Sequence, residues 1–139
     1  MAIWQTVFYL YCTYGKIRMD DINSIEKLSS RFPEKTSWSK NIRQFGDLDS
    51  TCIEFCYDNI ETSNEIEEIS VRLDLRSLTE EQVKSICSFA CDNNLLARSN
   101  EDVLEPTVDG LKKIIKQSDA CRFIKDPEQF LREISRNGI

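Results

Sequence analysis

The chain has 139 residues, of which 30% are charged and 40% hydrophobic, and its net charge is −6. This length predicts a single domain over residues 1–139, and no apolar run reaches the roughly 18 residues that a membrane span needs. The absence of histidine excludes Ser-His-Asp and Cys-His catalysis and His-ligated metals. The N-terminal segment lacks the basic region and cleavage site of a secretory signal, so we expect a cytoplasmic protein.

The first third of the chain predicts a strand, a helix and a second strand. Residues 3–14 are rich in β-branched and aromatic side chains and predict a buried strand that ends at Gly15. Apolar residues recur at near-helical spacing over 20–32, and the aspartate pair that opens this range predicts its N-terminal cap. Residues 38–45 predict a short strand that ends in a turn at Gly46.

The central segments 51–58 and 69–76 alternate between apolar and polar side chains. Such alternation predicts an antiparallel pair of strands, with one face on the core and one face in solvent. On the solvated face we expect Glu54, Asp58 and Asp74.

The second half of the chain predicts helices. Capping-box patterns start a helix over 77–93, and a short strand is expected at 95–97. A second helix opens at Pro106 or Thr107, and a last short helix is predicted over 126–134. The whole pattern indicates an α+β fold: an antiparallel sheet with helices packed on one face, strands mainly in the N-terminal half and helices mainly in the C-terminal half.

The six cysteines are expected to be reduced thiols, because the chain is long enough to build a core without disulfides. Two CxxxC pairs, Cys52 with Cys56 and Cys87 with Cys91, could form a four-thiolate zinc site if the fold joined them. Such pairs on regular elements are more often small buried apolar residues. We therefore predict no metal site and no cofactor.

The charge is strongly segregated along the chain. Residues 44–71 contain eight acidic residues and no Lys or Arg, whereas the rest of the chain has 16 acidic and 18 basic residues. We call this segment the acidic block; its acids are Asp47, Asp49, Glu54, Asp58, Glu61, Glu65, Glu67 and Glu68. Such a field can steer a basic partner to the surface, and the alternative is that the acids only solubilise the chain. The negative charge of the acidic block argues against nucleic-acid binding by the neighbouring aromatic residues.

A strand carrying VRLDLR, a capped amphipathic helix, an EPT segment and a DPEQFL ending follow one another over residues 67–131. This region resembles small bacterial immunity proteins of polymorphic toxin systems, including those of contact-dependent growth inhibition. The resemblance implies a non-catalytic protein that binds and neutralises a cognate toxin domain, often a nuclease, with carboxylates in place of substrate phosphates. The expected partner-binding residues are Glu54, Tyr57, Asp58, Glu61, Glu65, Glu67, Glu68 and Asp74.

Two other functions stay open. Glu54 and Asp74 could be the carboxylates of a small enzyme, and a strongly raised pKa on one of them would support that function. An adaptor subunit would instead expose a large apolar patch over Ile114, Ile115 and Phe123.

Overall fold

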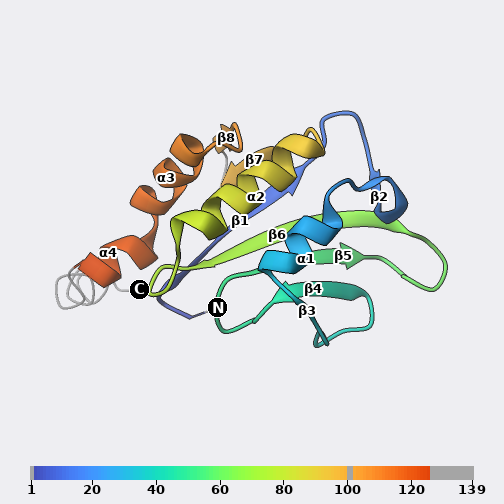
Figure 1. Cartoon of the computed structure of the whole chain (residues 1–139), viewed down its shortest axis with the longest axis horizontal. Helices are drawn as coiled ribbons and strands as arrows, with labels where there is room; N and C mark the ends of the chain where they lie inside the picture. The colour runs from blue at the N-terminus through green and yellow to red at the C-terminus, as the bar shows by residue number, and fades with distance from the viewer. Residues whose placement is uncertain (1, 100–101, 126–139) are drawn as a thin grey trace, which may run out of the picture.

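The structure is a computed structural model that describes residues 2–99 and 102–125. In this part of the chain, one eight-stranded antiparallel sheet is combined with four α-helices and a short 3-10 helix (Figure 1). The strands are β1 (Gln5–Tyr11), β2 (Ile17–Arg18), β3 (Glu34–Lys35), β4 (Ile42–Gly46), β5 (Cys52–Tyr57), β6 (Glu65–Asp74), β7 (Leu96–Ser99) and β8 (Asp102–Leu104). The helices are α1 (Ile25–Arg31), α2 (Glu80–Asp92), α3 (Val108–Gln117) and α4 (Asp119–Lys125). The predicted α+β fold is confirmed, with strands mostly N-terminal and helices mostly C-terminal.

The ten-residue strand β6 organises the sheet. The strand order of the sheet is β3-β4-β5-β6-β1-β7-β8, and β2 pairs with the same edge of β6 as β1 does. The predicted antiparallel pairing of the two alternating segments is confirmed as β5 with β6, where Ile53 lies opposite Val71 and Phe55 opposite Ile69. Alternation therefore sends these four apolar side chains to the same face.

The core lies between that face of the sheet and helices α1 and α2 (Figure 1). Phe8 and Phe55 are fully buried in it, and Leu28 of α1 packs against the same cluster. The ring of Phe55 meets the ring of Phe89 from α2 edge-on, at 5.8 Å between centroids. This arrangement is the favoured one for aromatic pairs, and it fixes α2 over the middle of the sheet.

The helix predicted after the first strand is divided. A 3-10 turn occupies Met19–Asp21, and α1 starts only after Ser24, which has a left-handed backbone with φ of 64°. Asn23 donates its N–H to the Asn93 side chain at 2.7 Å, and the Asn93 side-chain amide donates to the Asn23 carbonyl at 2.9 Å. This contact with the end of α2 is long-range, so local helical spacing could not predict the break.

The helix starts in the second half follow the predicted caps. Thr79 and Gln82 form a reciprocal capping box on α2, and the Thr107 side chain accepts a hydrogen bond from the backbone of the first turn of α3. Helix α4 was not predicted; Ser118 separates it from α3. The helix predicted over 126–134 lies outside the described residues. No helix within residues 2–99 and 102–125 combines the length and apolar character needed to cross a bilayer.

Gly46 closes β4 in a conformation that only glycine adopts without strain. Its φ is 93°, and an added Cβ would lie 2.5 Å from the Thr51 carbonyl oxygen. Gly15 also has a positive φ, of 123°, but an added Cβ there would meet no atom within 4 Å.

We expect Gly15→Ala to lower the free energy of unfolding by about 1–3 kcal/mol, the cost of backbone strain alone. Gly46→Ala should lower the free energy of unfolding by about 1–3 kcal/mol more than Gly15→Ala does, because the added methyl group also overpacks against the Thr51 backbone. Urea unfolding of the two variants measures the difference. Equal losses would show that the close approach of Thr51 is unimportant.

Candidate functional site on the outer face of the sheet

The face of the sheet opposite α1 and α2 is the outer face. One row of side chains crosses it, because the strand registers place Gln44 opposite Glu54, Glu54 opposite Ser70, Ser70 opposite Tyr9, and Tyr9 opposite Arg98. The Arg98 guanidinium lies 5.7 Å from the centroid of the Tyr9 ring. The outer face therefore mixes aromatic, polar and charged side chains.

Glu54 is buried on this face rather than solvated, which corrects the sequence prediction. Only 4% of it is exposed, and its carboxylate accepts a hydrogen bond from the Trp38 indole Nε1 at 3.2 Å. Arg72 Nη2 lies 3.5 Å from its other oxygen. Trp38 comes from the loop between β3 and β4 and is itself 71% exposed. Glu54 is thus positioned to orient an exposed indole, not to meet a partner directly.

The loop that carries Trp38 is tied to the sheet at both ends. The Ser37 hydroxyl donates to the Ile42 carbonyl at 2.7 Å, and the Asn41 carbonyl accepts the backbone N–H of Tyr57 at 2.8 Å. These bonds bring the loop back over β5, which is why Glu54 loses contact with solvent. The sequence offered one sign of this role: Trp38 stands alone in the polar stretch KTSWSKN, where no apolar periodicity assigns it to the core.

Asp74 is also buried, at 2% exposed, so its predicted place on a solvated face is wrong. Its carboxylate accepts hydrogen bonds from Arg76 Nε at 3.1 Å and Nη2 at 3.0 Å. These bonds hold the pKa of Asp74 below its usual value, against the opposing effect of burial. Arg76 in turn stacks on the Trp4 ring, at 3.8 Å from its centroid. Asp74 therefore anchors the end of β6.

Glu54 and Asp74 are not a catalytic pair in this fold. Glu54 lies opposite Ser70, and Asp74 is four residues farther along β6, which corresponds to about 13 Å. Paired carboxylates of glycosidases lie roughly 5–9.5 Å apart. In addition, the pKa of Asp74 is lowered, whereas a general acid needs a raised one.

Tyr57, an expected partner-binding residue, faces the core instead of the surface. It is 6% exposed, and burial raises its pKa, while the nearby Arg43 guanidinium opposes that rise. Ile66 beside it is buried as well, and Ile60 is partly buried. The exposed aromatic group in this region is Trp38 instead.

The fold neutralises half of the acidic block with cations from other segments. The ion pairs are Arg72–Glu54 (3.5 Å), Lys35–Asp47 (3.9 Å), Lys40–Glu61 (3.7 Å), Lys16–Glu65 (3.7 Å) and Arg18–Glu65 (4.0 Å). The four pairs other than Arg72–Glu54 lie near the surface and contribute at most about 1 kcal/mol each, but all five weaken the local negative field. Within residues 2–99 and 102–125, the acids of the block that form no ion pair are Asp49, Asp58, Glu67 and Glu68.

The remaining predicted partner-binding acids gather at one end of the β5–β6 hairpin. Asp58 and Glu61 lie in the connection between the strands, and Glu65, Glu67 and Glu68 lie on the first half of β6. All of them are exposed except Glu65, which is partly buried. The structure thus separates the eight predicted residues into this group of five, four of them exposed, and the buried Glu54, Tyr57 and Asp74.

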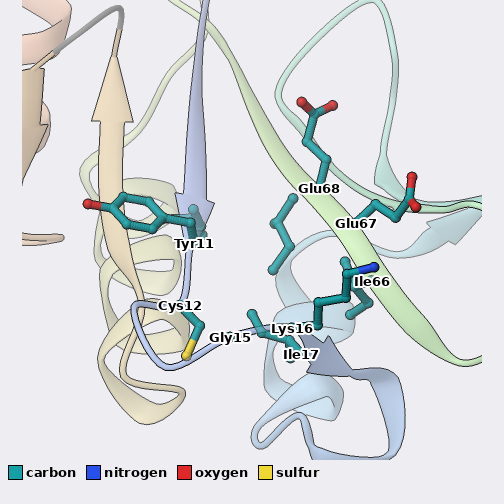
Figure 2. Close-up of a pocket in the computed structure, with 10 residues that line it drawn as sticks. Tyr11, Cys12, Gly15, Lys16, Ile17, Ile66, Glu67 and Glu68 are labelled. Carbon is teal, nitrogen blue, oxygen red and sulfur yellow. The ribbon is translucent and has the colours of Figure 1, made fainter.

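A gap interrupts the sheet beside Glu67 and Glu68. β1 pairs with β6 as far as Leu10 opposite Ile69, and β2 resumes the pairing at Ile17 opposite Ile66. Residues 11–16 therefore lie opposite only Glu67 and Glu68. The register with β5 also shifts here, which marks a β-bulge at Glu67. A pocket of about 390 Å³ occupies the gap. Figure 2 shows the Glu67 and Glu68 side chains extending from β6 on the side away from Tyr11 and Cys12.

The cysteines do not assemble a metal site. Cys52 and Cys56 lie on the outer side of β5, while Cys87 belongs to α2 on the other side of the sheet. Burial raises the pKa of each of these three thiols to about 11, so they are protonated at neutral pH. Among the described residues, no group of three or more potential ligands could hold a metal ion.

The apolar patch that an adaptor would need is not exposed. Ile114 is buried in the core, and Ile115 and Phe123 are partly buried. Helix α3 packs against α2 with this side.

No protein-family model, curated protein or solved structure matches the chain.

The lowered pKa of Asp74 predicts a pH dependence of stability. Ionised Asp74 stabilises the fold above the unfolded-state pKa of about 4, and this contribution is lost as the pH falls through the lower folded-state pKa. Asp74→Asn should therefore destabilise the protein at pH 7, and its difference from the wild type should shrink toward pH 2.5.

Urea unfolding at a series of pH values measures this difference. Asp102→Asn is the matched control, because Asp102 is exposed on β8; its effect should be small at every pH. A difference between wild type and Asp74→Asn that is the same at pH 7 and pH 2.5 would contradict the coupling to Arg76.

Proposed function

We propose that this chain is a non-catalytic protein-binding domain that neutralises a basic partner, in the manner of the immunity proteins that its sequence resembles. The observation that carries the proposal is the exposed acidic end of the β5–β6 hairpin beside Trp38. The carboxylates of Asp58, Glu67 and Glu68 form no ion pair there with the described residues, and the indole of Trp38 is exposed on the same face.

The unpaired carboxylates supply the electrostatic part of the proposal. Glu68 lies opposite Cys56, and Asp58 is two residues farther along the same strand direction. Fixed negative charge of this kind speeds the encounter with a positively charged partner and selects against acidic ones. In the complex, carboxylates can pair with the Lys and Arg side chains that a basic protein uses for its own substrate.

Trp38 supplies the apolar anchor. Tryptophan is enriched at the centre of protein interfaces, where it contributes a large share of the binding free energy. Here the indole is already oriented by Glu54, whose carboxylate accepts the Nε1 hydrogen bond. A side chain that is ordered before binding loses less conformational entropy on binding. The buried Glu54 therefore supports binding by fixing Trp38.

The two alternative functions receive less support. The carboxylate enzyme requires Glu54 and Asp74 to act together, but both are engaged in separate contacts about 13 Å apart along β6. The adaptor requires an apolar surface on α3 and α4, but Ile114 of that region is buried in the core. The outer face remains the surface with groups suited to a partner.

If the proposal is right, the rate of association with the partner depends on where the acidic side chains lie and not only on the net charge. The tagged chain is used to capture its partner from a lysate of the source organism, and the association rate with the purified partner is then measured at low and at about half-molar salt. Glu67→Lys/Glu68→Lys should slow association by ~10-fold or more at low salt, and the difference should nearly vanish at high salt because mobile ions screen the charges. The partner's own toxic or enzymatic activity should be inhibited by the wild-type chain.

The control variant is Glu26→Lys/Glu81→Lys, which changes the net charge by the same amount on the exposed surface of α1 and α2. Its association rate should stay close to that of the wild type. Equal slowing by both double variants would mean that net charge acts rather than this site. Unchanged association rates for Glu67→Lys/Glu68→Lys would contradict the electrostatic part of the proposal.

A further inference from the structure

We infer that the exposed face of the Trp38 indole binds one arginine side chain of the basic partner, whose guanidinium stacks on the ring. The inference rests on the proposed function and specifies the chemistry at its anchor. It depends on how Glu54 holds the ring, on what the chain places over its other tryptophan, and on the negative charge beside the loop that carries Trp38.

The hydrogen bond to Glu54 leaves the ring face as the surface that Trp38 offers to a partner. An indole has one polar group, the Nε1–H donor, and the Glu54 carboxylate already accepts it at 3.2 Å. Glu54 is 4% exposed whereas Trp38 is 71% exposed, so a buried carboxylate fixes an exposed ring. The π face of such a ring carries partial negative charge and attracts cations.

The other tryptophan shows what this chain itself places on an indole ring. The Arg76 guanidinium lies 3.8 Å from the centroid of the Trp4 ring, and it also donates hydrogen bonds of 3.0 and 3.1 Å to Asp74. Every cation–π contact between described residues uses arginine rather than lysine, and none of these contacts involves Trp38. A carboxylate, a guanidinium and an indole therefore already form one stacked unit in this fold.

The basic side chains closest to Trp38 in its surroundings are bound to other groups. Arg72 Nη2 lies 3.5 Å from the Glu54 carboxylate, and Lys40 Nζ, from the same loop as Trp38, lies 3.7 Å from Glu61 Oε1. Within residues 2–99 and 102–125, no cation of the chain stacks on the Trp38 ring. The cation that this ring suits must then come from a partner.

The loop that carries Trp38 adjoins an acidic segment. The Asn41 side chain accepts the backbone N–H of Ile60 at 3.1 Å, and the Asn41 carbonyl accepts that of Tyr57 at 2.8 Å. These two bonds join the loop to the start of the β5–β6 connection, where Asp58 lies between the two donors. Asp58 is exposed and forms no ion pair with the described residues. A cation bound at Trp38 therefore meets complementary charge at this edge of the surface.

Arginine suits this site better than the other groups that pack on an indole. A guanidinium is planar and weakly hydrated, so it stacks flat on an aromatic face, whereas an ammonium is compact and strongly hydrated. The aliphatic stem of arginine can cover the rest of the ring. A nucleobase also stacks on tryptophan, but its phosphates require a positive groove, and Asp58 makes this edge negative. A purely apolar side chain would gain nothing from that charge.

The test titrates the isotope-labelled full chain with two probes of equal charge, acetylated tetra-arginine amide and acetylated tetra-lysine amide. Both probes feel the acidic block equally, so the difference in their affinities reports on stacking. The wild type should bind tetra-arginine ~5-fold more tightly and shift the NMR signal of the Trp38 indole N–H. Trp38→Leu should weaken tetra-arginine binding by ~5- to 30-fold and reduce the preference over tetra-lysine to less than ~2-fold.

Tyr14→Leu is the matched control, because it removes another exposed aromatic ring, 90% exposed, that makes no cation–π contact among the described residues. It should leave both affinities unchanged. Trp38→Phe keeps a ring and should give an intermediate affinity for tetra-arginine. Equal binding of the two peptides by the wild type would overturn the inference. A preference that persists in Trp38→Leu, or an unshifted Trp38 indole N–H, would do the same.

The result can be separated from that of the proposed function. If the wild type binds the two peptides equally but Glu67→Lys/Glu68→Lys still slows association with the partner, the arginine site fails and the acidic binding face stands. If tetra-arginine binding depends on Trp38 but Trp38→Leu leaves the affinity for the partner unchanged, the ring binds arginine and its assignment to this partner is wrong.

Discussion

The pairing of β6 is the constraint on which the rest of the structure depends. This strand pairs with β1, β2 and β5 at once, so its alternation decides which side chains enter the core and which reach the outer face. Near its N-terminal end the register changes at Glu67, and β1 and β2 separate. One strand therefore builds the core through Val71 and Leu73 and opens the gap through its bulge.

Local patterns were sufficient for the elements that are long and regular. Alternation predicted the pairing of β5 with β6, and the capping box of Thr79 predicted the start of α2. Strands β2, β3 and β8 have only two or three residues, too few for alternation to be recognised. The same alternation places Tyr57 with Ile53 on the core face, so the strand pattern itself argues against contact between Tyr57 and a partner.

Long-range contacts explain what the sequence could not predict about the site. Glu54 and Asp74 alternate as solvated residues would, yet Trp38 covers one and Arg76 binds the other. The acidic block is contiguous in sequence, but half of its acids meet cations from distant segments in the fold, such as the pair Lys40–Glu61. A count of charges along the chain therefore overstates the negative field. What directs a partner is the position of the carboxylates that stay unpaired.

The central claim is that a partner docks on the outer face around Trp38 and the acidic end of the β5–β6 hairpin. Transferred cross-saturation NMR on the complex with the purified partner tests it most directly. The account predicts attenuated signals at the Trp38 indole N–H and at the backbone amides of residues 36–41 and 65–70. The indole of Trp4, whose Nε1 is buried, should keep its intensity and acts as the internal control. Attenuation confined to α1 and α2, with Trp38 unaffected, would contradict the account.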